Sequence, residues 1–380
     1  MKPSVPLRAG GQLPASVPAA AKERDRDQER APGQGRDRDV VLGVSDLSVD
    51  YLSSAGAAKA VDRVSFDLHQ SEFLAVVGES GCGKSTLLFA IAHLLSPPAE
   101  VTGGKVVFSG QNIVAMSEKK LRALRWRGLS VVMQSAMNAL NPVSSIGAQF
   151  ADALRAHGES DHDAVRSRSR QVLSMVGIDP VHLSSYPHQL SGGMRQRAMI
   201  AMALLFSPEL ILMDEPTSAL DVVAQRSLMV QVKQLQSELG FAIIFVTHDM
   251  SLVSHFSDRV AVMYAGQVVE ARGTKRLFDN PLHPYTRGLL EAFPSVYGPK
   301  VPLQGIPGSP PDLANLPVGC NFSPRCPEVM PRCRAAEPPL YQIEDAQVRC
   351  VLYDGGASVQ GSGASAPGGG ASAPGGGAGA

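Results

Sequence analysis

Long hydrophobic runs are missing from this 380-residue sequence. Spanning a lipid bilayer takes about 20 consecutive apolar residues, and the longest apolar stretches, 199–206 and 242–246, are far shorter. The amino-terminal residues also lack the apolar segment of a secretory signal. These absences predict a cytosolic chain that acts at a membrane only through partner proteins.

A net charge is missing too, because 35 Lys and Arg residues balance 35 Asp and Glu residues. Such a balance provides no overall field for nucleic acid or anionic lipid, and we expect no nucleic-acid partner. Cysteine is scarce as well. Five cysteines in a cytosolic chain argue against a disulfide framework and favour a metal site or reactive thiols.

The two ends of the chain differ from its centre in composition. Residues 1–38 are rich in Ala, Pro and Gly and end in a run that alternates Arg with Asp, which predicts a disordered tail. Residues 353–380 form a Gly/Ala/Ser/Pro tract with a repeated ASAPGGG, which predicts a flexible tail. We expect no chemistry in either tail.

Between the tails, the hydrophobic pattern is typical of an α/β fold with a parallel sheet. Partial alternation at 41–52 and 60–68 predicts half-buried antiparallel strands. Continuous apolar runs predict buried parallel strands at 73–77, 210–213 and 242–246. A helix is predicted at 84–95, ended by Pro97-Pro98.

Two regions depart from this pattern. A helical and loop-rich stretch over about 121–190 predicts an inserted helical subdomain. From Pro294 onward the chain is rich in Pro and Cys and too irregular for more sheet. We therefore predict a main domain at 39–295, followed by a small separate module at 296–352.

The segment Gly78–Ser85, GESGCGKS, matches the phosphate-loop pattern G-x-x-x-x-G-K-[ST] between a predicted strand and a predicted helix. Glycines let backbone N–H groups turn toward phosphate oxygens, and the helix N-terminus adds partial positive charge. Lys84 would reach the β- and γ-phosphates, and the Ser85 hydroxyl would bind Mg²⁺. The predicted nucleotide-binding residues of this segment are Gly78, Glu79, Ser80, Gly81, Cys82, Gly83, Lys84, Ser85 and Thr86.

Cys82, inside this loop, has two interpretations. It is either a small side chain at a permissive position or a redox-sensitive thiolate favoured by the helix N-terminus.

Two acids follow the apolar run at 210–213. Asp214 is placed to hold Mg²⁺ at the carboxyl end of the strand, where α/β sheets bind ligands. Glu215 would then face the γ-phosphate as the base that activates water. His248 follows another buried strand and is predicted to contact the γ-phosphate. An ordinary solvated turn is the alternative for the two acids alone, and the phosphate loop in the same chain argues against it.

The segment Leu190–Arg197, LSGGMRQR, resembles the signature LSGGQ of the ABC ATPase family, with Met194 at the position that is usually glutamine. Ser191, Gly192 and Gly193 open a helix and present a hydroxyl, N–H groups and a helix dipole to an anion. The resemblance implies that this clamp serves a nucleotide held by the opposite subunit. It also implies a P-loop NTPase fold with a RecA-like parallel core, an N-terminal antiparallel β subdomain and an inserted helical subdomain.

Other segments match the family in the same order along the chain. Gln134 follows the apolar run 129–133, as the family's Q-loop does, which implies a link from Mg²⁺ and water to the permease interface. Asp221 ends the segment Ser218–Asp221, which looks like the D-loop. Tyr51 lies where the family places an aromatic residue that stacks on adenine; a core aromatic residue is the alternative.

Further segments narrow the resemblance: Leu140–Val143, Tyr186–Gln189, Val262–Gly266, His283–Thr286 and Ile306–Pro311. They resemble the peptide/nickel importers, and the match over roughly residues 41–352 is similar to the first of the two ATPase subunits of dipeptide and oligopeptide permeases. This resemblance implies ATP hydrolysis that drives uptake of dipeptides, oligopeptides or nickel chelates. It also implies a distinct second ABC ATPase subunit, two transmembrane permeases and an extracytoplasmic substrate-binding protein, with this chain peripheral at the cytoplasmic face of the inner membrane.

Cys320, Cys326, Cys333 and Cys350 form the pattern C-x5-C-x6-C-x16-C. Four soft thiolates suit a tetrahedral metal or an iron–sulfur cluster, although this spacing fits neither zinc ribbons nor the short ferredoxin run. Family members with a similar tail imply a [4Fe-4S] cluster. Zinc and reduced structural thiols are the alternatives.

Two other kinds of ABC ATPase share the nucleotide motifs. A DNA-repair or chromosome-organising ATPase would need a long heptad coiled coil between Lys84 and Ser191, and the sequence there shows none. A translation-associated ATPase would carry two nucleotide domains, and this chain has one phosphate loop. We therefore favour the transporter subunit.

Overall fold

The computed structural model of the protein describes residues 39–54, 56–134, 139–292, 305–355 and 358–359. The predicted tail at 1–38 and most of the predicted tail at 353–380 lie outside these residues. Tyr353, at the start of the second tail, belongs to a 3-10 turn and donates its hydroxyl hydrogen to the Leu282 carbonyl at 2.9 Å. The ordered chain therefore continues past the predicted boundary.

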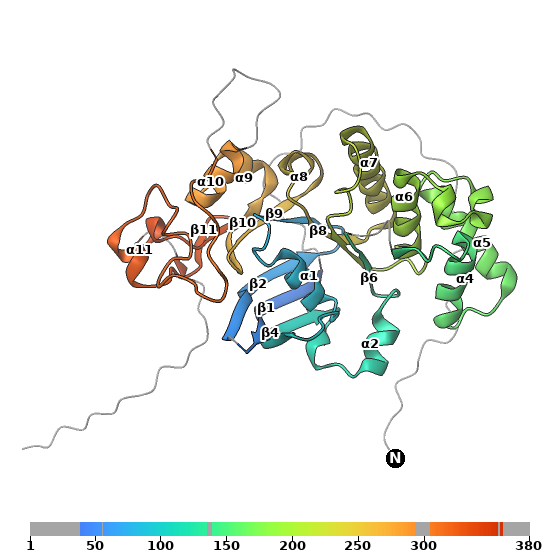
Figure 1. The fold of residues 1–380 in the computed structure, drawn as a ribbon, viewed down its shortest axis with the longest axis horizontal. Helices are drawn as coiled ribbons and strands as arrows, with labels where there is room; N and C mark the ends of the chain where they lie inside the picture. The colour runs from blue at the N-terminus through green and yellow to red at the C-terminus, as the bar shows by residue number, and fades with distance from the viewer. Residues whose placement is uncertain (1–38, 55, 135–138, 293–304, 356–357, 360–380) are drawn as a thin grey trace, which may run out of the picture. The chain divides into compact units, whose positions relative to one another are not determined.

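One sheet in the described part of the chain is antiparallel and has four strands in the order β2-β1-β4-β5 (Figure 1). The half-buried strands predicted near the amino terminus are confirmed as β1 and β2. The strand bounds are β1 (Val40–Ser53), β2 (Gly56–His69), β4 (Ala99–Phe108) and β5 (Gln111–Asn112).

The second sheet has nine strands in the order β13-β11-β12-β10-β9-β3-β8-β7-β6. From β9 to β6 the neighbours are parallel, and from β13 to β9 they are antiparallel. All residues of β3, β7 and β8 are buried, which explains their continuous apolar sequences, because a strand covered on both faces has no polar side. The bounds are β3 (Phe73–Val77), β6 (Leu129–Val132), β7 (Leu210–Asp214), β8 (Ala242–Val246), β9 (Arg259–Tyr264), β10 (Gln267–Gly273), β11 (Tyr341–Ile343), β12 (Ala346–Val348) and β13 (Ser358–Val359).

Helix α1 (Lys84–Ile91) lies between the two sheets, and its buried side chains Leu87, Leu88 and Ile91 belong to a core cluster shared with strands of both. The predicted end at Leu95 is wrong. His93 adopts a left-handed conformation with φ 52°, and the Leu94 N–H donates to the Phe89 carbonyl at 2.8 Å. This local turn ends the helix before the two prolines are reached.

The nine-stranded sheet also contributes to a second core cluster, which it shares with helices on the face opposite α1. Helices α5 and α6 are among them (Figure 1). Residues 121–190, predicted as a helical and loop-rich insertion, also contain strand β6, which follows the short helix α2 (Glu118–Leu124). Among the described residues between Lys84 and Ser191, the longest helix has 14 residues, too short for a long coiled coil. The bounds are α2 (Glu118–Leu124), α4 (Ile146–Ala156), α5 (His162–Met175), α6 (Gly192–Ala203) and α7 (Val222–Leu239).

The segment after Pro294 was expected to add no sheet, and this expectation is wrong. Strands β11 and β12 form a hairpin, and β12 pairs with β10 through Glu270 opposite Val348. Glu344 in the turn has φ 50°, and the strands are only three residues long, so their alternation was too brief to recognise in sequence. The remaining α-helices of the described residues are α8 (Met250–Phe256), α9 (Thr274–Asp279), α10 (Pro284–Glu291) and α11 (Pro331–Ala335).

Within the described ranges, none of the helices combines the length and the apolar character that crossing a membrane requires.

Candidate nucleotide-binding site

The phosphate loop connects β3 to α1 and depends on glycine at two positions. A Cβ atom on Gly78 would lie 2.2 Å from the Met263 carbonyl oxygen, and one on Gly83 would lie 1.9 Å from the Ala60 carbonyl oxygen. Both glycines also have positive φ, at 154° and 102°. The backbone of the loop can therefore adopt this course only without side chains at these positions.

Lys84, the first residue of α1, is 6% exposed and points back over the loop. Its Nζ donates to the carbonyl oxygens of Gly78 at 2.8 Å and Glu79 at 2.9 Å. Ser85 Oγ donates to Asp214 Oδ1 at 2.9 Å. The end of β7 and the start of α1 thus bring together the oxygen atoms that the sequence predicts as Mg²⁺ ligands.

Burial raises the pKa of Asp214, and the neighbouring Glu215 carboxylate raises it further, while the Ser85 hydroxyl and Lys84 act in the opposite direction. A hard divalent cation would favour the ionised form of this carboxyl group. The Ser85 hydroxyl and the Asp214 carboxyl group, in hydrogen-bond contact, supply the oxygen ligands that Mg²⁺ prefers, although Ser85 lines the cavity and Asp214 does not.

Glu215 contacts two of the other predicted catalytic residues, Gln134 and His248. Its Oε2 accepts a hydrogen bond from Gln134 Nε2 at 2.9 Å, and its Oε1 lies 3.3 Å from His248 Nδ1. Glu215 has φ 43°, a left-handed conformation that costs energy in a residue with a side chain. Its N–H donates to the Val246 carbonyl at 2.9 Å, which holds the turn in place.

A cavity of about 550 Å³ lies where the loops after β3, β6, β7 and β8 meet. This is the carboxyl edge of the parallel strands, where α/β sheets bind ligands. Lys84 is the one permanent cation among the described residues that line it. The lining residues are Tyr51, Ala60, Ser80, Gly81, Gly83, Lys84, Ser85, Thr86, Gln134, Glu215, His248 and Leu313.

Tyr51 comes from β1 and lies at the rim of this cavity. It is 38% exposed, and its hydroxyl oxygen is 3.2 Å from Thr86 Oγ1. The alternative of a core aromatic residue is therefore wrong, and the ring is accessible from the cavity. Leu313, which the sequence analysis missed, lines the same cavity from the carboxy-terminal segment. No local pattern marks this residue, because its proximity depends on the tertiary fold alone.

The signature residues lie outside this cavity. Ser191 caps α6, its Oγ accepting the Met194 N–H at 3.2 Å, and Gly192 and Gly193 form the first turn. Asp221 caps α7, its Oδ1 accepting the Ala224 N–H at 2.9 Å. These four residues, all within the described part of the chain, do not line the cavity that holds Lys84 and Glu215.

Three residues of the phosphate loop are likewise absent from the described cavity lining: Gly78, Glu79 and Cys82. Cys82 is buried, and burial raises the pKa of its thiol, which favours the small-side-chain interpretation over a reactive thiolate. Glu79 turns away to form an ion pair with Arg325. Sequence analysis missed Arg325, whose only local signal is its place between two cysteines.

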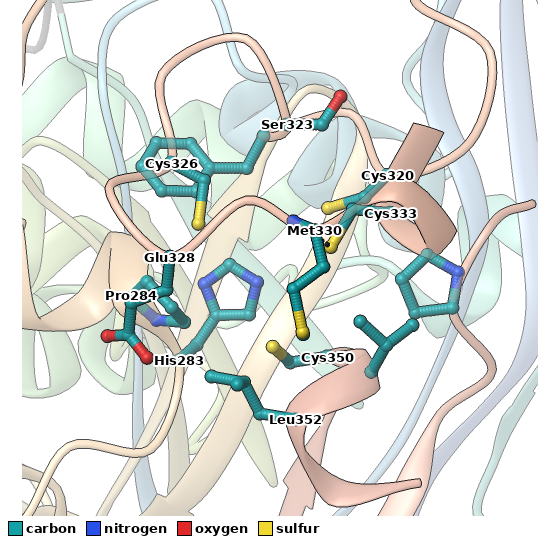
Figure 2. Close-up of a pocket in the computed structure, with 13 residues that line it drawn as sticks. His283, Pro284, Cys320, Ser323, Cys326, Glu328, Met330, Cys333, Cys350 and Leu352 are labelled. Atoms are coloured by element: carbon teal, nitrogen blue, oxygen red, sulfur yellow. Dashed lines mark hydrogen bonds between the residues drawn. The ribbon is translucent and has the colours of Figure 1, made fainter. Parts of the chain in front are cut away.

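The four carboxy-terminal cysteines line one small pocket of about 10 Å³, together with His283, Phe322 and Met330 (Figure 2). Burial raises the pKa of Cys320, and it raises those of Cys326 and Cys350 to about 11. In their present positions, no three described His, Cys, Asp or Glu side chains form a metal-binding group. All five cysteines are free thiols, and the predicted cluster stays a prediction.

His283 adds an unusual polar atom to this pocket. Its Nδ1 accepts the Tyr285 N–H at 3.0 Å, so the hydrogen of the neutral ring lies on Nε2. Burial lowers the pKa of His283 to about 3, which keeps the ring neutral. Nε2 is buried, and the Arg349 backbone carbonyl lies close enough to act on the ring and raise its pKa, in opposition to burial.

The fold and the nucleotide site define an ABC-type ATPase, and residues 61–218 match the family described as ABC transporter. Residues 269–333 match the family described as oligopeptide/dipeptide transporter, C-terminal region. The chain is 40% identical over 320 residues to the dipeptide transport ATP-binding protein DppD of Caldanaerobacter subterraneus, covering 83% of this chain and 98% of the relative. The chain belongs to the family of dipeptide and oligopeptide transport ATP-binding proteins.

Two further relatives are also transport ATP-binding proteins of similar sequence identity. DppD of Escherichia coli is 41% identical over 314 residues, covering 82% of this chain and 96% of the relative. The oligopeptide transport ATP-binding protein OppD of Bacillus subtilis is 40% identical over 309 residues, covering 80% of this chain and 86% of the relative.

Among solved structures, the ATP-binding cassette MJ0796, a dimer bound to ADP and Pi, has a TM-score of 0.56 and 28% identity. The match covers 61% of this chain and 98% of that one. CbiO1 of Clostridium perfringens, part of an ABC transporter complex, has a TM-score of 0.55 and 30% identity, covering 64% of this chain and 92% of that one. The predicted P-loop NTPase fold of the ABC type is confirmed.

Proposed function

We propose that this chain is the ATP-hydrolysing subunit of an ABC importer for dipeptides or oligopeptides. The observation that carries the catalytic part is the convergence of Gln134 and His248 on Glu215, at the edge of the cavity that holds Lys84. The cargo follows from the printed names of the relatives, which are dipeptide and oligopeptide transport proteins. Related peptide-like cargo such as nickel chelates belongs to the same proposal.

In this proposal, some residues of the cavity bind the nucleotide and others take part in its hydrolysis. Lys84 and the N–H groups of the phosphate loop bind the β- and γ-phosphates, with Tyr51 stacked on adenine at the rim. Glu215 accepts a proton from the attacking water, and the hydrogen bonds of Gln134 and His248 hold its carboxylate in place. Ser85 and Asp214, with Gln134, would hold Mg²⁺, which neutralises phosphate charge when bound.

A second ATPase subunit completes the site in this proposal. Ser191, Gly192, Gly193 and Asp221 lie outside the cavity of their own chain, so they would serve a nucleotide held by the partner. The N-terminus of α6, where Ser191, Gly192 and Gly193 lie, suits a γ-phosphate. Resemblance to the peptide permeases favours a distinct second ATPase as that partner, giving a heterodimer that sandwiches two ATP molecules.

The permease subunits would dock at an apolar groove beside Gln134. This groove has a volume of about 230 Å³ and is lined by residues of α6 and β6, of the segment after α1 and of the segment between α2 and β6. Trp126, Met133, Met199 and Met202 are among the lining residues. Methionine and tryptophan side chains adapt well to a partner helix. Movement of a permease helix in this groove would reach Gln134, which follows Met133. The chain would thus lie at the cytoplasmic face of the inner membrane, together with two permeases and a substrate-binding protein.

Introducing a negative charge into the groove tests whether this chain works with the permeases as proposed. Leu94→Glu places a carboxylate on an exposed lining residue. Burying it against a permease costs about 1–3 kcal/mol or more, which lowers the affinity about 5- to 150-fold. In proteoliposomes with the permeases and binding protein, we expect the variant to lose most dipeptide uptake and most permease-stimulated ATP hydrolysis.

Leu239→Glu is the matched control, because Leu239 is similarly exposed but lies at the end of α7 outside the groove. This variant should transport normally. Absence of dipeptide or oligopeptide uptake with wild-type protein, or equal uptake by both variants, would contradict the proposed assembly.

The cysteine pocket is proposed to hold a [4Fe-4S] cluster, with Zn²⁺ as the alternative. Cys320, Cys326, Cys333 and Cys350 would be the ligands. Four thiol groups that line one pocket fit a sulfur-bound metal centre, which would bind them as thiolates. The pocket has room for about one water molecule, so the cysteine side chains would turn to admit either occupant. A bound centre would stabilise a segment with little core of its own.

Metal analysis of protein purified without air decides this point. About four irons and four sulfides per chain, with broad visible absorbance, are expected for the wild type. Cys326→Ser should lose the metal, whereas Cys82→Ser, which changes the cysteine outside the pocket, should keep it. Zinc in place of iron would support the alternative, and metal-free wild type would leave the four thiols as a structural cluster.

A further inference from the structure

Glu79 in the phosphate loop forms an ion pair with the carboxy-terminal segment, residues 305–355. Its carboxylate accepts hydrogen bonds from Arg325, Nη1 to Oε2 at 2.7 Å and Nη2 to Oε1 at 2.9 Å. Such a paired contact fixes orientation as well as distance. The Arg325 side chain is 5% exposed and the Glu79 side chain 26%, so the pair is largely shielded from water and from screening by salt.

Arg325 has fixed contacts of its own. Its Nε donates to the Pro307 carbonyl at 2.8 Å, and its guanidinium lies 5.8 Å from the centre of the Tyr264 ring. Phe322, in the same loop, packs edge-on against Tyr264 with ring centres 5.2 Å apart. The guanidinium therefore offers Glu79 a fixed partner, unlike a mobile side chain on the surface.

The backbone of Glu79 is held by the same part of the molecule. Its N–H donates to Tyr285 Oη at 3.0 Å, and Tyr285 is fully buried against Tyr264 with ring centres 4.6 Å apart. The backbone carbonyl oxygen of Glu79 accepts a hydrogen bond from Lys84 Nζ at 2.9 Å. Glu79 thus connects Arg325 with the lysine that lines the nucleotide cavity.

We propose that Arg325 is a positioning residue for ATP binding. It holds Glu79 so that the phosphate loop keeps the shape that presents Lys84 to the cavity, and it neutralises a carboxylate that would otherwise repel the phosphates of ATP. The same segment reaches the cavity directly through Leu313, whose carbonyl accepts the Lys59 N–H at 3.2 Å. The carboxy-terminal segment is thereby a structural part of the ATP site.

Nucleotide affinity of the full-length chain tests this role. Arg325→Gln is expected to raise the Kd for a fluorescent ATP analogue with Mg²⁺ by about tenfold, because the Glu79 charge is left without its partner. Turnover at saturating ATP should change much less, since Glu215 and its two partners are untouched. A wild-type Kd in folded Arg325→Gln protein would overturn the proposal.

Removing both charges separates positioning from a general loss of structure. Glu79→Gln combined with Arg325→Gln is expected to bring the Kd back to within about threefold of the wild type, because the two residues act as a unit. Losses that simply add would contradict this coupling. Should Arg325→Gln not fold, Arg325→Lys takes its place: it keeps the charge but loses the paired contact. This variant should raise the Kd by about threefold, and an unchanged Kd overturns the proposal.

Arg332→Gln is the matched control, because Arg332 lies in the same segment, is half exposed and pairs with Asp354 at 3.5 Å. Its Kd should equal that of the wild type, and a shift as large as that of Arg325→Gln would indicate a general charge effect and contradict a specific role. The wild-type titration tests ATP binding itself, so failure of the ATPase assignment and failure of the Arg325 proposal are separate results.

Discussion

Glu215→Gln is expected to lower the ATP turnover number by about 10²- to 10⁴-fold, the range that a general base contributes, while ATP binding is retained. The amide has the size of the carboxylate but does not accept a proton from water. Gln134 and His248 lie 2.9 Å and 3.3 Å from the carboxylate oxygens, so neither has to move. Phosphate release under saturating MgATP and the Kd of a fluorescent ATP analogue measure the two effects.

Glu209→Gln provides the control for this prediction. Glu209 lies just before β7 and Glu215 just after it, so the two acids stand at opposite ends of one strand. Glu209 accepts a hydrogen bond from Ser109 Oγ at 2.9 Å, away from the cavity, and its variant should hydrolyse ATP at the wild-type rate. Turnover by Glu215→Gln above about a tenth of the wild-type rate would exclude Glu215 as the base.

The nucleotide cavity illustrates what the sequence can predict. Parallel strands end at one edge of a sheet, so residues one or two positions after β6, β7 and β8 are brought together by topology alone. Glu215 follows β7 directly, and it contacts both Gln134, two residues after β6, and His248, two residues after β8. Their positions could be expected because each is defined by a short apolar run and a polar residue shortly after it.

The ion pair between Glu79 and Arg325 shows where this reasoning stops. The two residues are 246 positions apart, and Arg325 lies in a loop rich in proline and cysteine without a periodic pattern. The hairpin β11–β12 was missed for a similar reason, because three-residue strands carry too little alternation to be recognised. Contacts between distant segments depend on tertiary packing, which spacing along the chain does not encode.

Lys84→Met is expected to lower kcat/KM for ATP by about 10²- to 10³-fold, the usual effect of removing one group that stabilises developing charge. Among the described residues that line the cavity, Lys84 is the sole Lys or Arg, so no other permanent cation replaces it. Methionine has a similar length and fills the 6%-exposed site. It leaves two loop carbonyl oxygens without their donor, at a cost of about 1–3 kcal/mol each.

The two active-site variants should differ in which step they remove. Lys84→Met should weaken ATP binding as well as turnover, because the lysine ammonium group is expected to contact the phosphates before and during the reaction, whereas Glu215→Gln should leave binding intact. Lys105→Met, an exposed lysine on β4, should alter neither step. Wild-type ATP affinity in Lys84→Met would mean that the N–H groups of the loop suffice to bind the phosphates, and Lys84 would then act on the loop's shape through Gly78 and Glu79.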